Sequence, residues 1–185
     1  GLPAAGIGAA AALRNVRPRA VVLLGSCGAY AGSLRERGLQ VAVPASVQLT
    51  DAASARKQAA YPAPMVIAAP ADPRLHAGLC RGQTRLLRGK LANTLGITTD
   101  DRLARELARA TECETENLEA LGVALACQAS DVPFAAVLVV TNLVGKHGRS
   151  QWLANHRAAA ERGATFVLEW LARGAPGLSR SAKPG

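Results

Sequence analysis

Aromatic residues are scarce in this chain: Phe, Trp and Tyr make up 3% of its 185 residues, so the core has to be built from Ala, Val and Leu. Uninterrupted apolar runs of about 18 residues are absent, which excludes a membrane-spanning helix. The first residues carry neither a basic segment nor a long apolar one, so we expect no signal peptide. These absences predict a soluble cytoplasmic protein with no membrane partner.

Closely spaced cysteines are also lacking. Cys27, Cys80, Cys113 and Cys127 are separated by 53, 33 and 14 positions, so no pair has the C-x-x-C spacing of a metal or redox motif. A chain of this size does not depend on disulfides to fold. We therefore expect reduced thiols and no metal site.

Acidic residues are few relative to basic ones: 22 Lys and Arg against 13 Asp and Glu give a formal net charge of +9. Such a balance raises nucleic acid as a partner. The excess is mostly arginine scattered singly along the chain, with no run of five and almost no aromatic interleaving. We interpret it as a feature of composition and expect no nucleic-acid partner; a basic patch is the alternative.

Hydrophobic residues make up 49% of the chain and charged residues 19%, which excludes a disordered protein, and the length suits one domain. We expect a single domain over residues 1–174 and a frayed tail over 175–185. Apolar runs predict strands at 19–28, 39–43, 65–69 and 135–140, and helical spacing predicts helices at 7–14, 73–79, 99–108, 118–129 and 150–171. Asp72 and Asp100 are expected to cap two of these helices. The alternation of strands and helices predicts a three-layer α/β domain.

Two glycine motifs are candidates for ligand binding. Gly6-Ile7-Gly8 fits the dinucleotide pattern G-x-G-x-x-A, but no strand precedes it, so we interpret it as a glycine turn that starts a helix and expect no cofactor. Gly25-Ser26-Cys27-Gly28 follows a buried strand, where ligands collect in α/β sheets. It is not a nucleophile elbow, because G-x-S-x-G would need glycine at Leu24. A ligand-facing loop and a simple tight turn both remain open.

Acidic and amide side chains supply the other candidates. Glu112, Glu114, Glu116 and Glu119 precede an apolar helix, where most acids are solvated and favour the helix N-terminus. Glu119 is expected one turn into the apolar stretch, where a carboxylate needs donors, so it is a candidate for binding hydroxyl groups. Asn142 ends a strand, where it either starts a turn or takes part in chemistry.

Four motifs together resemble the nucleoside phosphorylase superfamily, in its branch of purine phosphorylases and methylthioadenosine nucleosidases. They are Gly6-Ile7-Gly8, Gly25-Ser26-Cys27-Gly28-Ala29, Glu116-Asn117-Leu118-Glu119-Ala120, and Val132-Pro133-Phe134 with its strand to Thr141-Asn142. The last two are similar to the family signatures V-E-M-E-[AG] and V-P-F…R-x-[IV]-S-[DN]. Order and spacing agree across residues 6–172, and the segment from Asn142 to Trp152 looks most like the futalosine hydrolase branch.

The resemblance implies roles for particular residues. Glu119 matches the family's ribose-binding glutamate, and Asn142 matches the residue that polarises N7 of the base; these two are the candidate catalytic residues. Ser26 matches the loop that faces phosphate or the attacking water, and Leu118 takes the place of the methionine under the sugar. Further candidate substrate-binding residues are Gly25, Cys27, Asn117 and Ile97.

The departures from the family pattern bear on the reaction. Leu23 stands where phosphorylases carry an arginine in the strand before the glycine loop, which favours hydrolysis over phosphorolysis. Leu138 stands where an arginine is usual in the strand before Thr141. Family members also have strands upstream of the position of Gly6, so the resemblance implies a phosphorylase-like fold with a central mixed sheet, shortened at its N-terminus. We expect a nucleosidase acting on a 6-oxopurine nucleoside such as futalosine. The alternatives are a catalytically impaired nucleoside-binding or structural paralogue and a purine nucleoside phosphorylase. An exposed apolar sheet edge would need cover, so a homodimer or larger homo-oligomer is expected.

Overall fold

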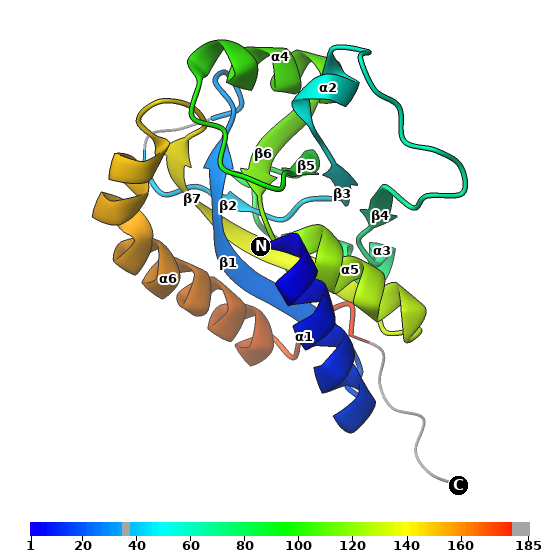
Figure 1. Cartoon of the computed structure of the whole chain (residues 1–185). Coiled ribbons are helices and arrows are strands. Elements are labelled where there is room, and N and C mark those ends of the chain that lie inside the picture. Colours follow the sequence, from blue (N-terminus) through cyan, green and yellow to red (C-terminus); the bar gives the residue numbers. More distant parts are fainter. Residues whose placement is uncertain (35–37, 179–185) are drawn as a thin grey trace, which may run out of the picture.

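The computed structural model describes residues 1–34 and 38–178 (Figure 1). In these ranges the chain forms six helices: α1 (Leu2–Asn15), α2 (Ala52–Ala55), α3 (Pro73–Cys80), α4 (Asp101–Thr111), α5 (Ala120–Ala129) and α6 (Gly148–Ala172). It also forms seven strands: β1 (Val21–Ala29), β2 (Val41–Ala42), β3 (Ser46–Leu49), β4 (Ala68–Pro70), β5 (Lys90–Asn93), β6 (Cys113–Asn117) and β7 (Phe134–Leu143). Asp72 and Asp100 cap α3 and α4 through their carboxylates, as predicted.

The strands make one mixed sheet in the order β2-β7-β1-β6-β5-β3-β4. β7 runs parallel to β1 along the whole of β1 and antiparallel to the short β2. β6, β5 and β3 are parallel to one another. The two halves of the sheet meet where Gly28 and Ala29 of β1 pair antiparallel with Glu116 and Thr115 of β6. Polar loops at the carboxyl ends of β1, β6 and β7 are thereby brought to one place.

Helices cover both faces of this sheet, which confirms the predicted α/β class with a mixed central sheet. On one face, α1 and α5 pack over a cluster that includes Leu121, Cys127 and Leu138. On the other face, α6 and α3 pack over a second cluster that includes Val137, Phe166 and Trp170. Because β7 supplies side chains to both clusters, its residues 134–141 are buried throughout.

The glycine motif near the N-terminus has a different role from the one predicted. Gly6 lies inside α1 and starts no turn. A Cβ built on Gly122 of α5 would come within 2.5 Å of the Leu2 carbonyl oxygen and 2.9 Å of the Gly6 nitrogen. The glycines therefore allow two helix backbones to pack closely, and that requirement is invisible to a search for nucleotide motifs.

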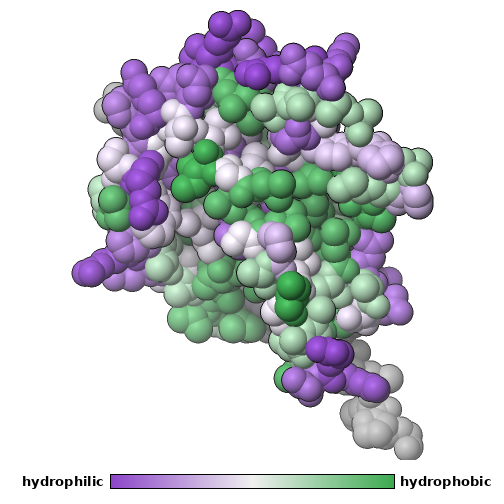
Figure 2. All heavy atoms as spheres, viewed as in Figure 1, coloured by the Kyte–Doolittle hydropathy of each residue, from purple (hydrophilic) through white to green (hydrophobic). Residues whose placement is uncertain are grey.

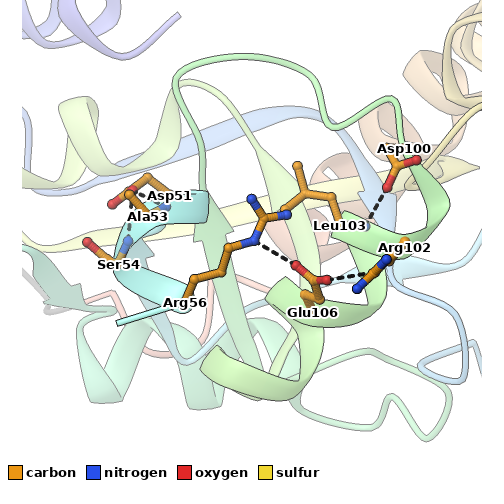
Figure 3. Close-up of polar contacts among 8 residues, drawn as sticks. All are labelled: Asp51, Ala53, Ser54, Arg56, Asp100, Arg102, Leu103 and Glu106. Atoms are coloured by element: carbon orange, nitrogen blue, oxygen red, sulfur yellow. Dashed lines mark hydrogen bonds and ion pairs between the residues drawn. The ribbon is translucent and has the colours of Figure 1, made fainter. Parts of the chain in front are cut away.

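Side-chain contacts join α4 to α2 (Figure 3). Glu106 of α4 accepts hydrogen bonds from Arg56, at the end of α2, and from Arg102, one turn earlier in α4. At the start of α2, the Asp51 carboxylate accepts the backbone N–H groups of Ala53 and Ser54. The Glu106 contacts therefore hold α2 against α4.

Sequence analysis did not predict the strands β3, β5 and β6 or the helix α2. The strand predicted at 65–69 is shorter and later in the structure, where it is the edge strand β4. Part of the expected frayed tail is placed: the Pro176 carbonyl accepts the indole N–H of Trp170 at 3.1 Å. The rest of that tail, 179–185, falls outside the described residues. Among the residues that are described, no helix is long and apolar enough to cross a membrane.

Candidate active site

A cavity of about 290 Å³ opens where β1, β6 and β7 end and α6 begins. Seven of the eight predicted site residues line it: Ser26, Cys27, Ile97, Asn117, Leu118, Glu119 and Asn142. Gly25 does not; its missing side chain faces Leu138 Cδ2 in the sheet. The pairing of β1 with β6, where the two halves of the sheet meet, thus brings residues as distant in sequence as Ser26 and Trp152 to one site.

Glu119 lies at the start of α5. The prediction that it lies one turn inside the apolar stretch is therefore wrong. It occupies the N-cap position, and its carboxylate makes no capping bond to its own helix. The side chain is 39% exposed, and one carboxylate oxygen lies 3.3 Å from the amine of Gly1. Glu119 is thus a half-exposed carboxylate on the wall of the cavity.

The side chain of Asn117 organises the site from within the turn between β6 and α5. Its Oδ1 accepts the backbone N–H groups of Glu119 and Ala120, both at 2.8 Å. Its Nδ2 donates to the Ser26 carbonyl oxygen at 3.0 Å. Asn117 therefore caps α5 and ties Glu119 to the loop after β1, a positioning role in addition to its place on the cavity wall. An Asn before an apolar helix is a sequence signal for such a cap.

Asn142 lies beside Gly28 in the sheet, in van der Waals contact that only glycine permits. A Cβ on Gly28 would stand 2.9 Å from Asn142 Nδ2, and one on Gly148 would stand 3.1 Å from the same atom. Asn142 Oδ1 accepts the Thr141 hydroxyl at 2.8 Å, and Nδ2 donates to the Leu143 carbonyl at 2.9 Å. One N–H of the amide is engaged in this way, which leaves the second for a ligand.

The first turns of α6 close the cavity with an aromatic wall. The indole N–H of Trp152 donates to Ser26 Oγ at 3.2 Å. The Arg149 guanidinium lies 5.0 Å from the Trp152 ring, and the His156 ring stacks on the same indole at 4.7 Å. The Ser26 hydroxyl proton stays free to donate, because its oxygen is the acceptor in the bond from Trp152.

Glu116 is the residue that sequence analysis missed. It was grouped with solvated acids before a helix, but it lies on β6, is 7% exposed, and lines the cavity. Its carboxylate accepts the Tyr30 hydroxyl at 3.0 Å, the Thr98 hydroxyl at 2.6 Å and the Thr98 N–H at 3.1 Å. Burial, followed by the Glu116 charge, raises the pKa of Tyr30. The network holds the loop that carries Ile97 against the cavity.

The one cysteine that lines the cavity is Cys27. Burial raises the pKa of Cys27, so its thiol does not ionise near neutral pH and is a poor nucleophile. Within residues 1–34 and 38–178, no cluster of three or more His, Cys, Asp or Glu is arranged to hold a metal ion. The polar side chains that line the cavity include two carboxylates, two amides, two hydroxyls and one guanidinium, a set suited to binding a sugar and a heterocyclic base.

Comparisons with known proteins agree with this architecture. The family model described as the phosphorylase superfamily matches residues 1–172. No sequence among the curated proteins matches significantly.

Solved structures of similar fold include nucleosidases and a futalosine hydrolase. A methylthioadenosine/S-adenosylhomocysteine nucleosidase from Colwellia psychrerythraea, in complex with adenine, is 19% identical with a TM-score of 0.81; the alignment covers 96% of this chain and 76% of that one. A futalosine hydrolase mutant from Helicobacter pylori is 14% identical with a TM-score of 0.80, over 94% and 77% of the two chains. An S-adenosylhomocysteine nucleosidase from Streptococcus pyogenes is 18% identical with a TM-score of 0.78, over 90% and 73%.

Proposed function

Because the chain belongs to the phosphorylase superfamily, we propose that it is a nucleosidase that hydrolyses the N-glycosidic bond of a purine nucleoside, with a 6-oxopurine nucleoside such as futalosine or inosine as substrate. The observation that carries this proposal is the convergence of Glu119 and Asn142 on one cavity from two different strand ends. The two residues provide a carboxylate for the sugar and an amide for the base.

Glu119 acts on the ribose. In hydrolysis the bond from C1′ to N9 breaks, the oxygen of water bonds to C1′, and one proton of that water ends on the departing base. Positive charge develops on the sugar before the new bond is complete, and a carboxylate that binds the sugar hydroxyls stabilises it. Asn117 holds Glu119 through its backbone N–H, which keeps the carboxylate in position for this role.

Asn142 acts on the base. Its free amide N–H donates to N7 or to O6 of a 6-oxopurine and so stabilises negative charge on the leaving group. Adenine presents an amino donor at position 6, which a carboxyl group would accept and an amide N–H would not. Buried polar groups left unpaired cost about 1–3 kcal/mol, so selectivity against adenine follows from this residue type. The named relatives include one bound to adenine, which makes adenine nucleosides the informative comparison.

Water is the proposed nucleophile. The side chain of Leu138, where the resemblance expects arginine, is fully buried in the core, and Leu23 packs in the same cluster. Neither supplies a cation for phosphate. Arg149 is the observation that favours a second candidate, a purine nucleoside phosphorylase, because it lines the cavity with a guanidinium able to bind an anion.

The test is release of base from futalosine, inosine and methylthioadenosine, each with and without phosphate. Hydrolysis predicts free ribose or its derivative at a rate independent of phosphate, whereas phosphorolysis predicts the 1-phosphate and a requirement for phosphate. We expect faster release of hypoxanthine than of adenine, and Asn142→Asp should shift that preference toward adenine. No release from any of the three substrates by folded protein would overturn the enzyme assignment, and an unchanged preference in the variant would reduce Asn142 to a turn residue.

A further inference from the structure

The segment from Asn142 to Gly148, which joins β7 to α6, borders two cavities. Asn142, Gly148 and Arg149 line the candidate active site. Residues 143–145 line a second cavity of about 230 Å³, together with residues of α4. Because space adjoins the segment on both of these sides, its position depends on a few specific contacts.

The first residue of α4 makes one of these contacts. Asp101 Oδ1 accepts the backbone N–H of Lys146 at 2.9 Å, and Asp101 Oδ2 lies 3.7 Å from Lys146 Nζ. Gly145 has a φ of +136°, and a Cβ at that position would clash with Asp101 Oδ1. Only glycine therefore lets the segment approach α4 this closely. Figure 1 shows the segment beside the first turn of α4.

The Asp101 carboxylate suits a charged contact at this position. The hydrogen bond from the Lys146 N–H is the main reason that the pKa of Asp101 lies below its ordinary value, and the Lys146, His147 and Arg105 side chains act in the same direction. The Asp101 side chain is 43% exposed, and Figure 2 shows hydrophilic residues over α4. The carboxylate is therefore ionised at neutral pH, and a hydrogen bond to a charged acceptor is stronger than one to a neutral acceptor.

Val144 connects this contact to Asn142. The Val144 N–H donates to the Ala29 carbonyl at 2.9 Å, and its side chain packs in a buried cluster with residues of α4. A Cβ on Gly28 would meet Val144 Cγ2 at 2.8 Å and Asn142 Nδ2 at 2.9 Å, so both side chains lie against the same glycine. A shift of the segment away from α4 would withdraw Val144 from Gly28 and leave Asn142 free to turn.

A turn within the segment makes a second connection. The Gly148 N–H donates to the Gly145 carbonyl at 3.0 Å, and Lys146 lies within the turn that this bond closes. A Cβ on Gly148 would stand 3.1 Å from Asn142 Nδ2 and 3.3 Å from the Leu143 carbonyl, which accepts a hydrogen bond from the same Nδ2. The Asn142 amide therefore packs against the turn that Asp101 contacts.

We propose that Asp101 is a positioning residue for Asn142: through the Lys146 N–H it holds the segment between β7 and α6 against α4, and so fixes the amide that contacts the base. This role rests on the proposed function, which gives Asn142 the base. Asp101 lines the second cavity and acts on Asn142 through the segment. In the sequence it resembles any acid in the first turn of a helix, so its role becomes visible only in the structure.

Amide hydrogen exchange tests the contact independently of activity. Asp101→Ala removes the acceptor, so exchange at the Lys146 and Val144 amides should rise at least about tenfold. Asp101→Asn keeps an oxygen acceptor, and exchange should stay within about threefold of wild type. The matched control is Glu106→Ala, an acid of the same helix whose partners lie at the end of α2 and in α4. Equal exchange in Asp101→Ala and Glu106→Ala would overturn the proposal.

Base preference tests whether the contact reaches Asn142. Asp101→Ala should lower kcat/KM about tenfold for inosine and much less for adenosine, so the ratio between them should fall at least about fivefold. Asp101→Asn and Glu106→Ala should keep the ratio of the wild type. A merely structural role lowers both rates together, so an unchanged ratio in Asp101→Ala would overturn the proposal.

An NMR measurement separates this role from the proposed function. If the wild type releases no base, the proposed function fails, and the Asn142 side chain still reports on its position. Its two Nδ2 proton signals, identified by their loss in Asn142→Asp, should shift in Asp101→Ala and stay in place in Glu106→Ala. Signals that stay in place in Asp101→Ala would overturn the positioning role.

Discussion

The two ends of β1 differ in what surrounds them. At the carboxyl end, Gly28 and Ala29 lie between β6 and β7, and Ala29 is 0% exposed. Toward the amino end, Leu24 is 44% exposed although it belongs to the same strand and the same sheet. The cavity that bears the candidate chemistry is therefore built at the carboxyl end of β1, where β6 and β7 both pair with the strand.

The largest difference between the ends should be in stability. Leu138 of β7 is 0% exposed, so Leu138→Ala should cost about 3–4 kcal/mol of unfolding free energy. Leu24→Ala, on β1 at the position paired with Val137, should cost about 1 kcal/mol or less, because the Leu24 side chain is already 44% exposed. Urea denaturation measures both. Equal losses would mean that Leu24 is covered in solution.

Glycine substitutions sharpen the comparison through activity. A Cβ on Gly28 would come within 2.8 Å of Val144 Cγ2 and 2.9 Å of Asn142 Nδ2, so Gly28→Ala should displace Asn142 and lower kcat/KM about 100-fold. The matched control is Gly25→Ala, whose Cβ would meet only Leu138 Cδ2 at an ordinary 3.4 Å. It should keep nearly full activity. Similar activities of the two variants would contradict the placement of Asn142 in the site.

The Glu116 network at the carboxyl end of β1 can be tested by removing the Tyr30 hydroxyl, with Tyr61 as the comparison. Tyr30 is 1% exposed and donates to the buried Glu116 carboxylate, so Tyr30→Phe should destabilise the fold by about 1–2 kcal/mol. Tyr61 donates to Asp51 at a more exposed position, and Tyr61→Phe should cost less. Thermal unfolding compares the pair, and a larger loss for Tyr61→Phe would argue against a buried network.

The smallest expected effect concerns the cap of α2. The hydrogen bond from Tyr61, followed by those from Ser54, lowers the pKa of Asp51 from 3.8 to about 2. A carboxyl group whose pKa is lowered by folding stabilises the fold above its unfolded pKa and loses that contribution as the pH falls toward its folded pKa. The wild type should lose stability between about pH 4 and pH 2 by a small amount that Asp51→Asn does not show. Parallel pH profiles would refute this assignment.

Apolar pattern and capping residues predicted β7, α4 and the caps at Asp72 and Asp100, because these signals are local. β6 was missed because its sequence, Cys-Glu-Thr-Glu-Asn, is polar. Its burial is compensated by partners distant in sequence: Tyr30 is 86 positions from Glu116, and Ser26 is 91 from Asn117. The cavity residues were found through a resemblance, whereas the antiparallel pairing of β1 with β6 could be learned only from the structure.

The central claim is that the cavity cleaves a glycosidic bond with Glu119 on the sugar, and hypoxanthine release from inosine by Glu119→Gln tests it most directly. The matched control is Glu112→Gln, an acid from the same run whose side chain is 80% exposed and pairs with Lys90. We expect kcat/KM to fall at least about 100-fold for Glu119→Gln and to stay within about twofold of wild type for Glu112→Gln. Full activity of folded Glu119→Gln would contradict the account.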